Sequence, residues 1–240
     1  PMPSFVDEYP TDIFMYENRL GILSGETVTL SESGEFFNFF RTTVIDLLDT
    51  APIEVTGSSR GVNTLRHAVP FKGNLLLFGD NTQFMLGSGN AGLSPRTVAM
   101  SQVSNYASDP DCPPQIVGDS IFFAYPRGSY GGVQEMVIQD PEVRAVKAYD
   151  ITDSVPSYIE DNVRMMAAIP QENLLVCLPQ STDEDMSTLY LYKYLDRGEE
   201  RVQSAWFKFT LSSFGAEAAD YTQIAGIHAI ENPVIIKVGV

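Results

Sequence analysis

The stretch AVPFKGNLLL at residues 68–77 returns in a changed form as AIPQENLLV at residues 168–176. Each copy has a short apolar run that ends in proline, then a polar turn, then a second apolar run. Apolar and β-branched runs bounded by Gly, Pro and Asn are typical of paired strands. The two copies therefore predict two related β-hairpins in different parts of the chain.

The remaining apolar runs form groups of neighbouring candidate strands, which we call packets, and these packets recur at nearly regular spacing. The second strand of successive packets begins its apolar core at Val28, Leu75, Ile121, Leu174 and Val234, which gives steps of 47, 46, 53 and 60 residues. The packets cover approximately residues 19–40, 67–101, 114–149, 163–210 and 224–240. The three middle packets each contain four candidate strands, whereas the first contains Arg19–Leu23, Thr27–Leu30 and Glu35–Phe40.

Four strands in every 45–60 residues are typical of the blades of a β-propeller, in which each blade covers its faces with its neighbours. We therefore expect an all-β fold, a β-propeller-like array of four-stranded antiparallel blades. Residues 1–240 would form one such domain or fragment, with residues 1–18 as an N-terminal extension. A β-sandwich with similar hairpins is the alternative. The only helical candidate is Arg41–Asp49, which the β-branched run Thr42–Ile45 weakens.

Composition excludes several classes of protein. Fifteen Lys and Arg against 31 Asp and Glu give a net charge of −16, which disfavours a grip on the DNA backbone or on anionic lipid. The longest apolar runs, Leu75–Phe78 and Ile121–Tyr125, are too short to insert into a membrane.

Cys112 and Cys177 are expected as incidental reduced thiols, with one disulfide between them as the alternative. The apolar segment Pro233–Val240 needs strand partners from elsewhere, so we expect this chain to be part of a longer polypeptide.

A glycine-rich segment, Gly87–Gly92, satisfies the G-x-G-x-x-G pattern of dinucleotide-binding loops. That chemistry needs a helix N-terminus aimed at the pyrophosphate, but Pro95 and another β run follow. Asp109 and Asp111 lie near the offset of a ribose ligand, but in a proline-broken loop. A hairpin tip explains the glycines better, and we expect no cofactor.

Nucleophilic catalysis needs a base of intermediate pKa, and only His67 and His228 are available. Both fall inside expected strands, where packed structural histidines are the simpler interpretation. Neither the histidines and cysteines nor the acidic run Asp183–Asp185 has the spacing of metal ligands. We expect no metal site.

Paired carboxylates could hydrolyse a glycoside, but most acids here cluster in turns. Glu135 is the one carboxylate on an apolar strand, and a single carboxylate is not a pair. Arg60, Arg66 and Lys72 are the nearest approach to a basic patch, and they are scattered. We therefore expect no enzyme, with no catalytic, cofactor-binding or metal-binding residues.

The segment NRLGILSGETVTLSESGEFFNF at residues 18–39 resembles the tail tubular protein B, or nozzle protein, family of short-tailed bacteriophages. The resemblance runs collinearly from about Glu17 to Phe207, which is most of the chain. Further matching blocks are LRHAVPF at 65–71, LLLF at 75–78, IFFA at 121–124, PRGSY at 126–130, VPSYI at 155–159 and QSAW at 203–206.

The resemblance implies a structural protein of the virion, made in the host cytoplasm, that contains a β-propeller-like domain. It implies a homohexameric nozzle ring below the tail adaptor protein, which closes the DNA channel until ejection and helps to seat the tail fibre protein. Duplex DNA would be only a non-specific cargo in the channel. The alternative function is a propeller-type glycan-binding module or glycoside hydrolase that acts on the host surface.

Four residues carry local expectations. Ala68 and Ala168 occupy the same place in the repeat, so we expect both in tight sites on the first strand of a blade. Trp206 is the only tryptophan and is expected as a buried anchor, with Lys208 pointing outward between two phenylalanines.

Overall fold

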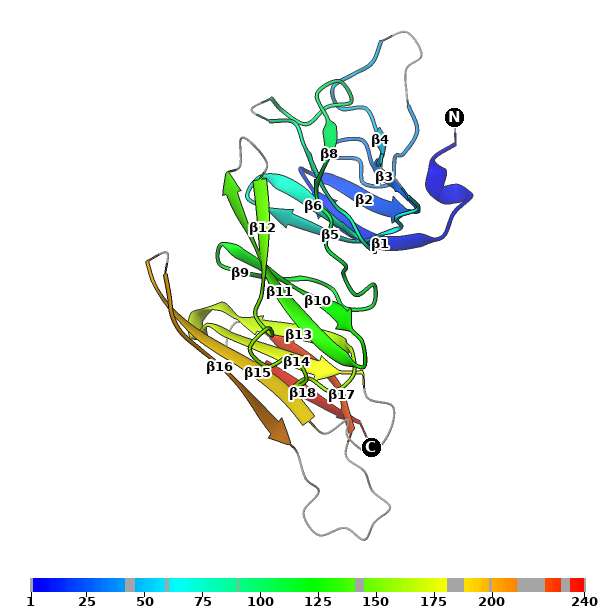
Figure 1. Cartoon of the computed structure of the whole chain (residues 1–240). Helices are drawn as coiled ribbons and strands as arrows, with labels where there is room; N and C mark the ends of the chain where they lie inside the picture. The colour runs from blue at the N-terminus through cyan, green and yellow to red at the C-terminus, as the bar shows by residue number, and fades with distance from the viewer. Residues whose placement is uncertain are drawn as a thin grey trace. The chain divides into compact units, whose positions relative to one another are not determined.

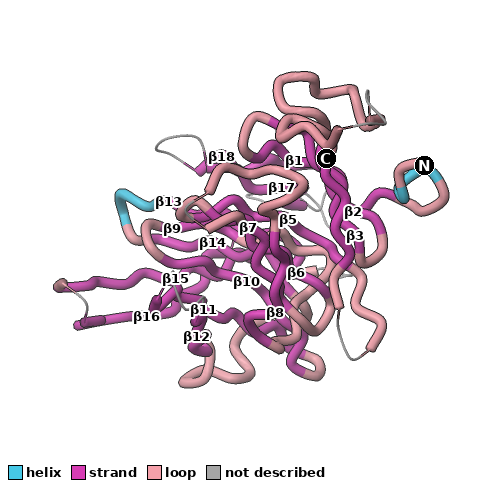
Figure 2. The backbone as a smooth tube through the Cα atoms, turned by 90° about the horizontal axis from the view of Figure 1, so that it is seen from above, coloured by secondary structure: helices cyan, strands magenta, loops and turns pink. Residues whose placement is uncertain are grey.

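A computed structural model describes residues 2–41, 46–58, 61–89, 91–140, 145–180, 188–198, 200–210, 223–229 and 234–239. These residues form an all-β fold whose helical structure is limited to two 3₁₀ turns, η1 (Ser4–Val6) and η2 (Pro170–Glu172) (Figure 2). The strands form four four-stranded antiparallel sheets and one two-stranded sheet (Figure 1). The predicted fold class, four-stranded antiparallel sheets in an all-β chain, is confirmed.

The chain divides into two compact units. The first comprises Pro1–Pro110 and Gln139–Val146 and contains two complete sheets. Leu23, Val28 and Leu30 of one sheet share a buried apolar cluster with Leu75 and Leu77 of the other. The sheets consist of β1 (Pro10–Tyr16), β2 (Arg19–Ser24), β3 (Thr27–Leu30) and β4 (Ile53–Thr56), and of β5 (Leu65–Phe71), β6 (Asn74–Gly79), β7 (Gln83–Gly87) and β8 (Ala99–Ser104).

The second unit comprises Asp111–Ile138 and Lys147–Val240. Its strands are β9 (Gln115–Val117), β10 (Ser120–Arg127), most of β11 (Tyr130–Asp140) and of β12 (Ala145–Asp150), then β13 (Val163–Ile169), β14 (Leu174–Pro179), β15 (Thr188–Arg197), β16 (Glu200–Thr210), β17 (Gln223–Ala229) and β18 (Val234–Gly239). Phe122 and Val133 share a core with Leu175 and Tyr192, so the β9–β12 and β13–β16 sheets pack face to face. Ile227 of β17 covers the opposite face of the β13–β16 sheet. Face-to-face sheets of this kind are what blades require, whereas closure into a propeller and a single domain over residues 1–240 stay predictions.

The first packet departs from the sequence prediction at both ends. The expected extension of residues 1–18 contains β1, and the fourth strand of the sheet is β4. Glu35–Phe40, expected as a strand, lies in turns instead, because Asn38 N–H bonds to the Glu35 carbonyl at 3.0 Å and closes the chain on itself. Of the helical candidate Arg41–Asp49, residues 42–45 lie outside the described part, and residues 46–49 are not helical.

The two repeated hairpins have different turns. In the first, the two-residue turn Lys72–Gly73 has positive φ at both positions, as a type I′ hairpin requires, and Ala68 pairs with Leu77. In the second, η2 makes a longer turn and Ala168 pairs with Leu175. Both alanines lie on the first strand of a four-stranded sheet, as predicted. Ala168 is buried whereas Ala68 is half-buried, so only the former occupies a closed site.

Candidate functional site

The only carboxylate that the sequence singled out, Glu135 on β11, is buried and engaged by Arg201 on β16. Arg201 Nη2 donates to Glu135 Oε1 at 3.0 Å, and Nη1 donates to the other carboxylate oxygen. Arg201 also donates from Nε to Asp196 Oδ1 at 2.8 Å. Such bidentate pairing fixes both side chains and couples two sheets of the second unit.

Aromatic side chains surround this ion pair. The Arg201 guanidinium lies 4.2 Å from the ring centroid of Tyr194, and its Nη1 donates to Tyr192 Oη at 3.2 Å. Burial, together with the negative charge of Glu135, raises the pKa of Tyr194 to about 12. Partial burial lowers the pKa of Arg201, but hydrogen bonds to Asp196 and Glu135 outweigh it and leave the pKa raised. Both carboxylate oxygens of Glu135 are occupied by the Arg201 guanidinium, which leaves Glu135 poorly placed for acid catalysis.

Trp206 extends the same cluster. Its ring centroid lies 4.9 Å from that of Tyr192, and its Nε1 donates to the Ile151 carbonyl at 2.9 Å. The side chain is half-buried rather than fully buried as expected, because β16 is the edge strand of its sheet. Lys208 is exposed as predicted, but Phe207 and Phe209 on the opposite face of the strand are also largely exposed.

The two histidines lie on strands, as predicted. His67 is on β5, and its Nε2 lies 3.0 Å from the Pro110 carbonyl oxygen. Burial lowers the pKa of His67, and Arg66 adds to that effect while Asp12 and Asp109 oppose it. His228 is on β17, and its side chain lies outside the described part.

The remaining sequence motifs bring no reactive groups together. Gly87 ends β7, and no helix follows the glycine-rich segment among the residues described before β8 begins at Ala99. Cys112 and Cys177 are both buried and form no disulfide, and burial raises the pKa of the Cys177 thiol. Asp183–Asp185, Arg60 and Asn90 lie outside the described residues. The described residues contain no group of three or more His, Cys, Asp or Glu suited to a metal ion.

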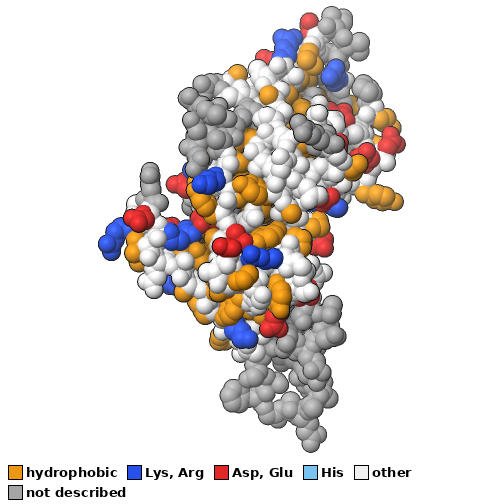
Figure 3. Space-filling model, in the orientation of Figure 1, with side chains coloured by type: hydrophobic (Ala, Val, Ile, Leu, Met, Phe, Trp, Pro, Cys, Tyr) orange, Lys and Arg blue, Asp and Glu red, His pale blue; other side chains and the backbone are white. Residues whose placement is uncertain are grey.

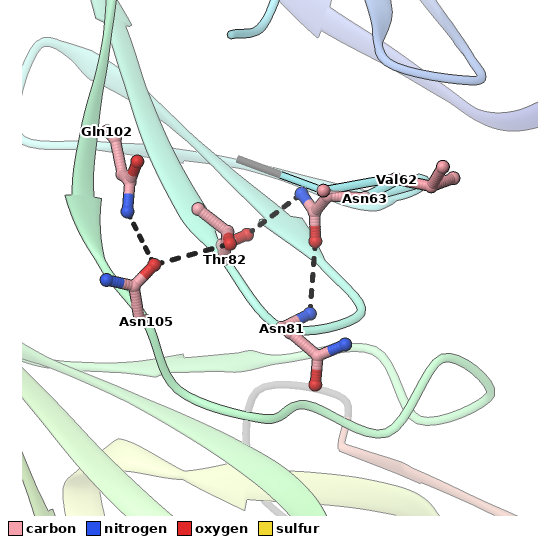
Figure 4. Close-up of a pocket in the computed structure, with 7 residues that line it drawn as sticks. Val62, Asn63, Asn81, Thr82, Gln102 and Asn105 are labelled. Carbon is pink, nitrogen blue, oxygen red and sulfur yellow. Dashed lines mark hydrogen bonds between the residues drawn. The ribbon is translucent and has the colours of Figure 1, made fainter. Parts of the chain in front are cut away.

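A polar hollow of about 610 Å³ in the first unit was not anticipated from the sequence (Figure 4). Its lining combines carboxamides and a hydroxyl from separate segments: Gly61, Val62, Asn63, Asn81, Thr82, Gln102 and Asn105. Asn63 Oδ1 accepts from the Asn81 N–H at 3.0 Å, and Asn105 Oδ1 accepts from Gln102 Nε2 and from Thr82 Oγ1. The Asn and Gln residues near the strand ends are visible in the sequence, but nothing in the sequence indicates that their side chains lie close together.

Among the described residues, no helix has the length and apolar character needed to cross a membrane.

The family model for bacteriophage nozzle proteins matches residues 1–232. Tail tubular protein gp12 of Escherichia phage T7 is 35% identical over 208 residues, which cover 86% of this chain. The chain spans 25% of the length of that relative.

Solved structures with a similar fold share little sequence. The Nup170 N-terminal domain in complex with Nup53, from Chaetomium thermophilum, gives a TM-score of 0.56 at 12% identity, covering 99% of this chain and 37% of that one. Hsv2 of Kluyveromyces lactis gives a TM-score of 0.52 at 10% identity, covering 95% and 58%. These likenesses concern the fold alone.

Proposed function

Because this chain belongs to the bacteriophage nozzle protein family, we propose that it forms part of the wall of the nozzle at the end of a phage tail. Six copies of the full protein would form a ring below the tail adaptor protein. The ring would close the DNA channel until ejection, let the genome pass, and help to seat the tail fibre protein. The observation that carries this proposal is the family match over nearly the whole chain.

The fold supports a gate that works through its loops. The strands of the four-stranded sheets are joined along their length by backbone hydrogen bonds, and Arg201 ties the β13–β16 sheet to Glu135 of the β9–β12 sheet. Long connections such as residues 31–41 and 105–114 lie outside these strands. Loops can change conformation while packed sheets stay fixed, so a channel can open without unfolding its wall.

Charge supports passage of DNA without adhesion. The net charge of −16 gives phosphates few cations to bind, and each phosphate bound would release counterions and slow the sliding duplex. DNA would be confined by such a wall rather than held by it.

The test is to assemble phage particles without this protein and to measure how much packaged DNA nuclease degrades. We expect the genome to leak and become nuclease-sensitive, and addition of the purified full-length protein before packaging ends should restore protection. Full, nuclease-resistant particles in its absence would refute the role in closing the channel.

The hollow in the first unit favours a second candidate function, the binding of a glycan on the host surface. None of the described residues that line it carries a charge, and carboxamides and hydroxyls are suited to the hydroxyl groups of neutral sugars. Titration of purified host polysaccharide into the protein, with Asn105→Ala as the comparison, tests for binding. Binding that the substitution abolishes would favour the glycan role, and new reducing ends would indicate hydrolysis.

A further inference from the structure

The outer half of the β13–β16 sheet has an uncovered apolar face. Phe209 of β16 pairs with Leu189 of β15. Two residues earlier, Phe207 pairs with Leu191, so all four side chains lie on one face of the sheet. Phe207 is 44% exposed, Phe209 is 50% exposed and Leu191 is half-buried; we call these three residues the outer strip. Large apolar side chains gathered on one exposed face are typical of a surface that another element covers.

The inner half of the same face is already covered by β17. Ile227 of β17 shares a buried cluster with Ala167 of β13 and Val176 of β14. The strand β17 lies mainly against β13, and less against β14 (Figure 1). It forms a two-stranded sheet with β18, whereas each of the other described sheets has four strands. The two described strands of this covering sheet leave the outer strip exposed.

Stacked sheets elsewhere in the chain meet in a constant order. In the first unit, β1 lies against β5 and β4 lies against β8, so first strand meets first strand and fourth meets fourth. In the second unit, β9 lies against β13, and Trp206 of β16 donates to the carbonyl of Ile151, which directly follows β12. The contact of β17 with β13 repeats this order. By the same order, the fourth strand of the β17–β18 sheet would lie over β16.

The strand order within the sheets indicates where the missing strands come from. In each four-stranded sheet, neighbouring strands are consecutive in the sequence. Among the described strands β18 pairs only with β17, so its other edge can accept the next strand of the chain. A second copy would have to supply two adjacent strands in the correct order, whereas the same chain needs only to continue its repeated pattern. This chain spans 25% of the length of its phage T7 relative, so family members have further chain to supply these strands.

We propose that the outer strip is the docking surface for two further strands of the same polypeptide, which complete the β17–β18 sheet to four strands. The third strand of that sheet packs on Leu191, and the fourth places apolar side chains on Phe207 and Phe209. The completed sheet then covers the whole face of β13–β16, as that sheet and β9–β12 cover each other on the opposite face. This docking needs only the longer polypeptide and does not depend on the proposed nozzle role.

The test places the photoreactive residue p-benzoylphenylalanine at position 207 of the full-length protein and irradiates the purified protein. We expect a covalent adduct with a segment of the same chain outside residues 1–240, located by mass spectrometry. Mixing isotope-labelled and unlabelled copies before irradiation separates adducts within one chain from adducts between copies. The matched control carries the group at Lys208, which is exposed on the opposite face of β16, and should lose that adduct. Adducts only within residues 1–240 or with another copy, or no adduct at all, would overturn the proposal.

A second measurement needs no substitution. Hydroxyl-radical labelling of the wild-type full-length protein, compared with the urea-unfolded chain, reports whether Phe207 and Phe209 are covered. We expect both side chains to lose most of their labelling on folding. Val202 on the same strand is 51% exposed and should stay reactive. Phenylalanine labelling that falls no further than that of Val202 would show that the outer strip faces solvent, against the proposal.

Discussion

Arg201 on β16 binds both carboxylate oxygens of Glu135 on β11, and the two residues are 66 positions apart in the sequence. The contact joins two four-stranded sheets of the second unit beside their shared core. It also explains why an acidic side chain is tolerated at a buried strand position, since its charge is matched by a guanidinium with fixed geometry.

Replacing Arg201 by Gln should therefore destabilise the protein by about 2–3 kcal/mol, because Glu135 would remain buried without its charged partner. Arg201 is partly exposed, which keeps the loss below that of a fully buried pair. Urea denaturation measures the change in the free energy of unfolding. Arg197→Gln is the matched control on an exposed arginine and should change it by less than about 0.5 kcal/mol. Equal effects of the two substitutions would contradict the structural role.

Ala168→Leu should lower the free energy of unfolding by about 1–3 kcal/mol, because Ala168 pairs with Leu175 and is buried in the same core cluster of the second unit. The matched substitution Ala68→Leu should cost less, since Ala68 is half-buried and a larger side chain can reach solvent. Thermal unfolding of both variants gives the comparison. A larger loss at Ala68 would show that the two hairpins are packed differently from the structure described.

The sequence predicted the strands best where local signals agree. In β5–β6 and β13–β14, apolar runs, turn residues and proline all indicate a hairpin, and the packets predicted to begin at residues 67 and 163 begin within two residues of β5 and β13. Prediction failed at Glu35–Phe40, where a phenylalanine-rich stretch looks like a strand but pairs with none of the described strands. β-propensity reflects a half-buried sheet surface, and only the tertiary structure supplies that surface.

Long-range polar contacts could not be predicted at all. Arg19 is an ordinary surface residue by type, yet it is buried and satisfies carbonyls up to 32 positions away. The carboxamides around the polar hollow likewise come from separate segments, including Asn63, Asn81 and Asn105. No periodicity records which polar residues will meet, because their positions follow from how the sheets pack.

The half-buried indole of Trp206 should give an emission maximum at shorter wavelength than free tryptophan, because Tyr192 covers one face and Nε1 is hydrogen-bonded. Trp206 is the only tryptophan, so the signal reports this site alone. Tyr192→Leu should shift the emission to longer wavelength, whereas Tyr9→Leu, at an exposed tyrosine, should not. Emission like that of free tryptophan in the wild-type protein would show that the indole is fully solvated.

His67 should make stability depend on pH below neutrality. Burial lowers its pKa in the folded state, so below about pH 6.5 the unfolded chain binds a proton that the folded chain does not. The stability that the neutral His67 side chain gives the folded state is fully present above that pH. It is lost as the pH falls through the lowered pKa of His67. His67→Gln should flatten the decline in the free energy of unfolding between pH 7 and 5. An unchanged slope would show that His67 does not titrate differently on folding.

Duplex DNA is the last ligand for which the structure gives a clear expectation. Several of the described Lys and Arg side chains already form ion pairs with carboxylates: Arg66 with Asp80, Arg127 with Asp150, Lys193 with Glu172 and Arg201 with Glu135. Arg19 is buried against carbonyls. On the face shown in Figure 3, the basic side chains are few and separated, and none forms a continuous basic area.

We therefore expect only the weak end of non-specific DNA binding at physiological salt, with a Kd on the order of 10⁻⁴ M, because few cations remain to displace counterions from phosphates. Titration of the protein into a fluorescently labelled duplex at two salt concentrations measures this affinity. The matched comparison is a variant in which Glu172 and Asp80 are replaced by Gln and Asn, which frees Lys193 and Arg66 and should strengthen binding at low salt. Micromolar affinity of the wild-type protein that falls steeply with salt would reveal a basic surface and would mean that DNA is gripped rather than confined.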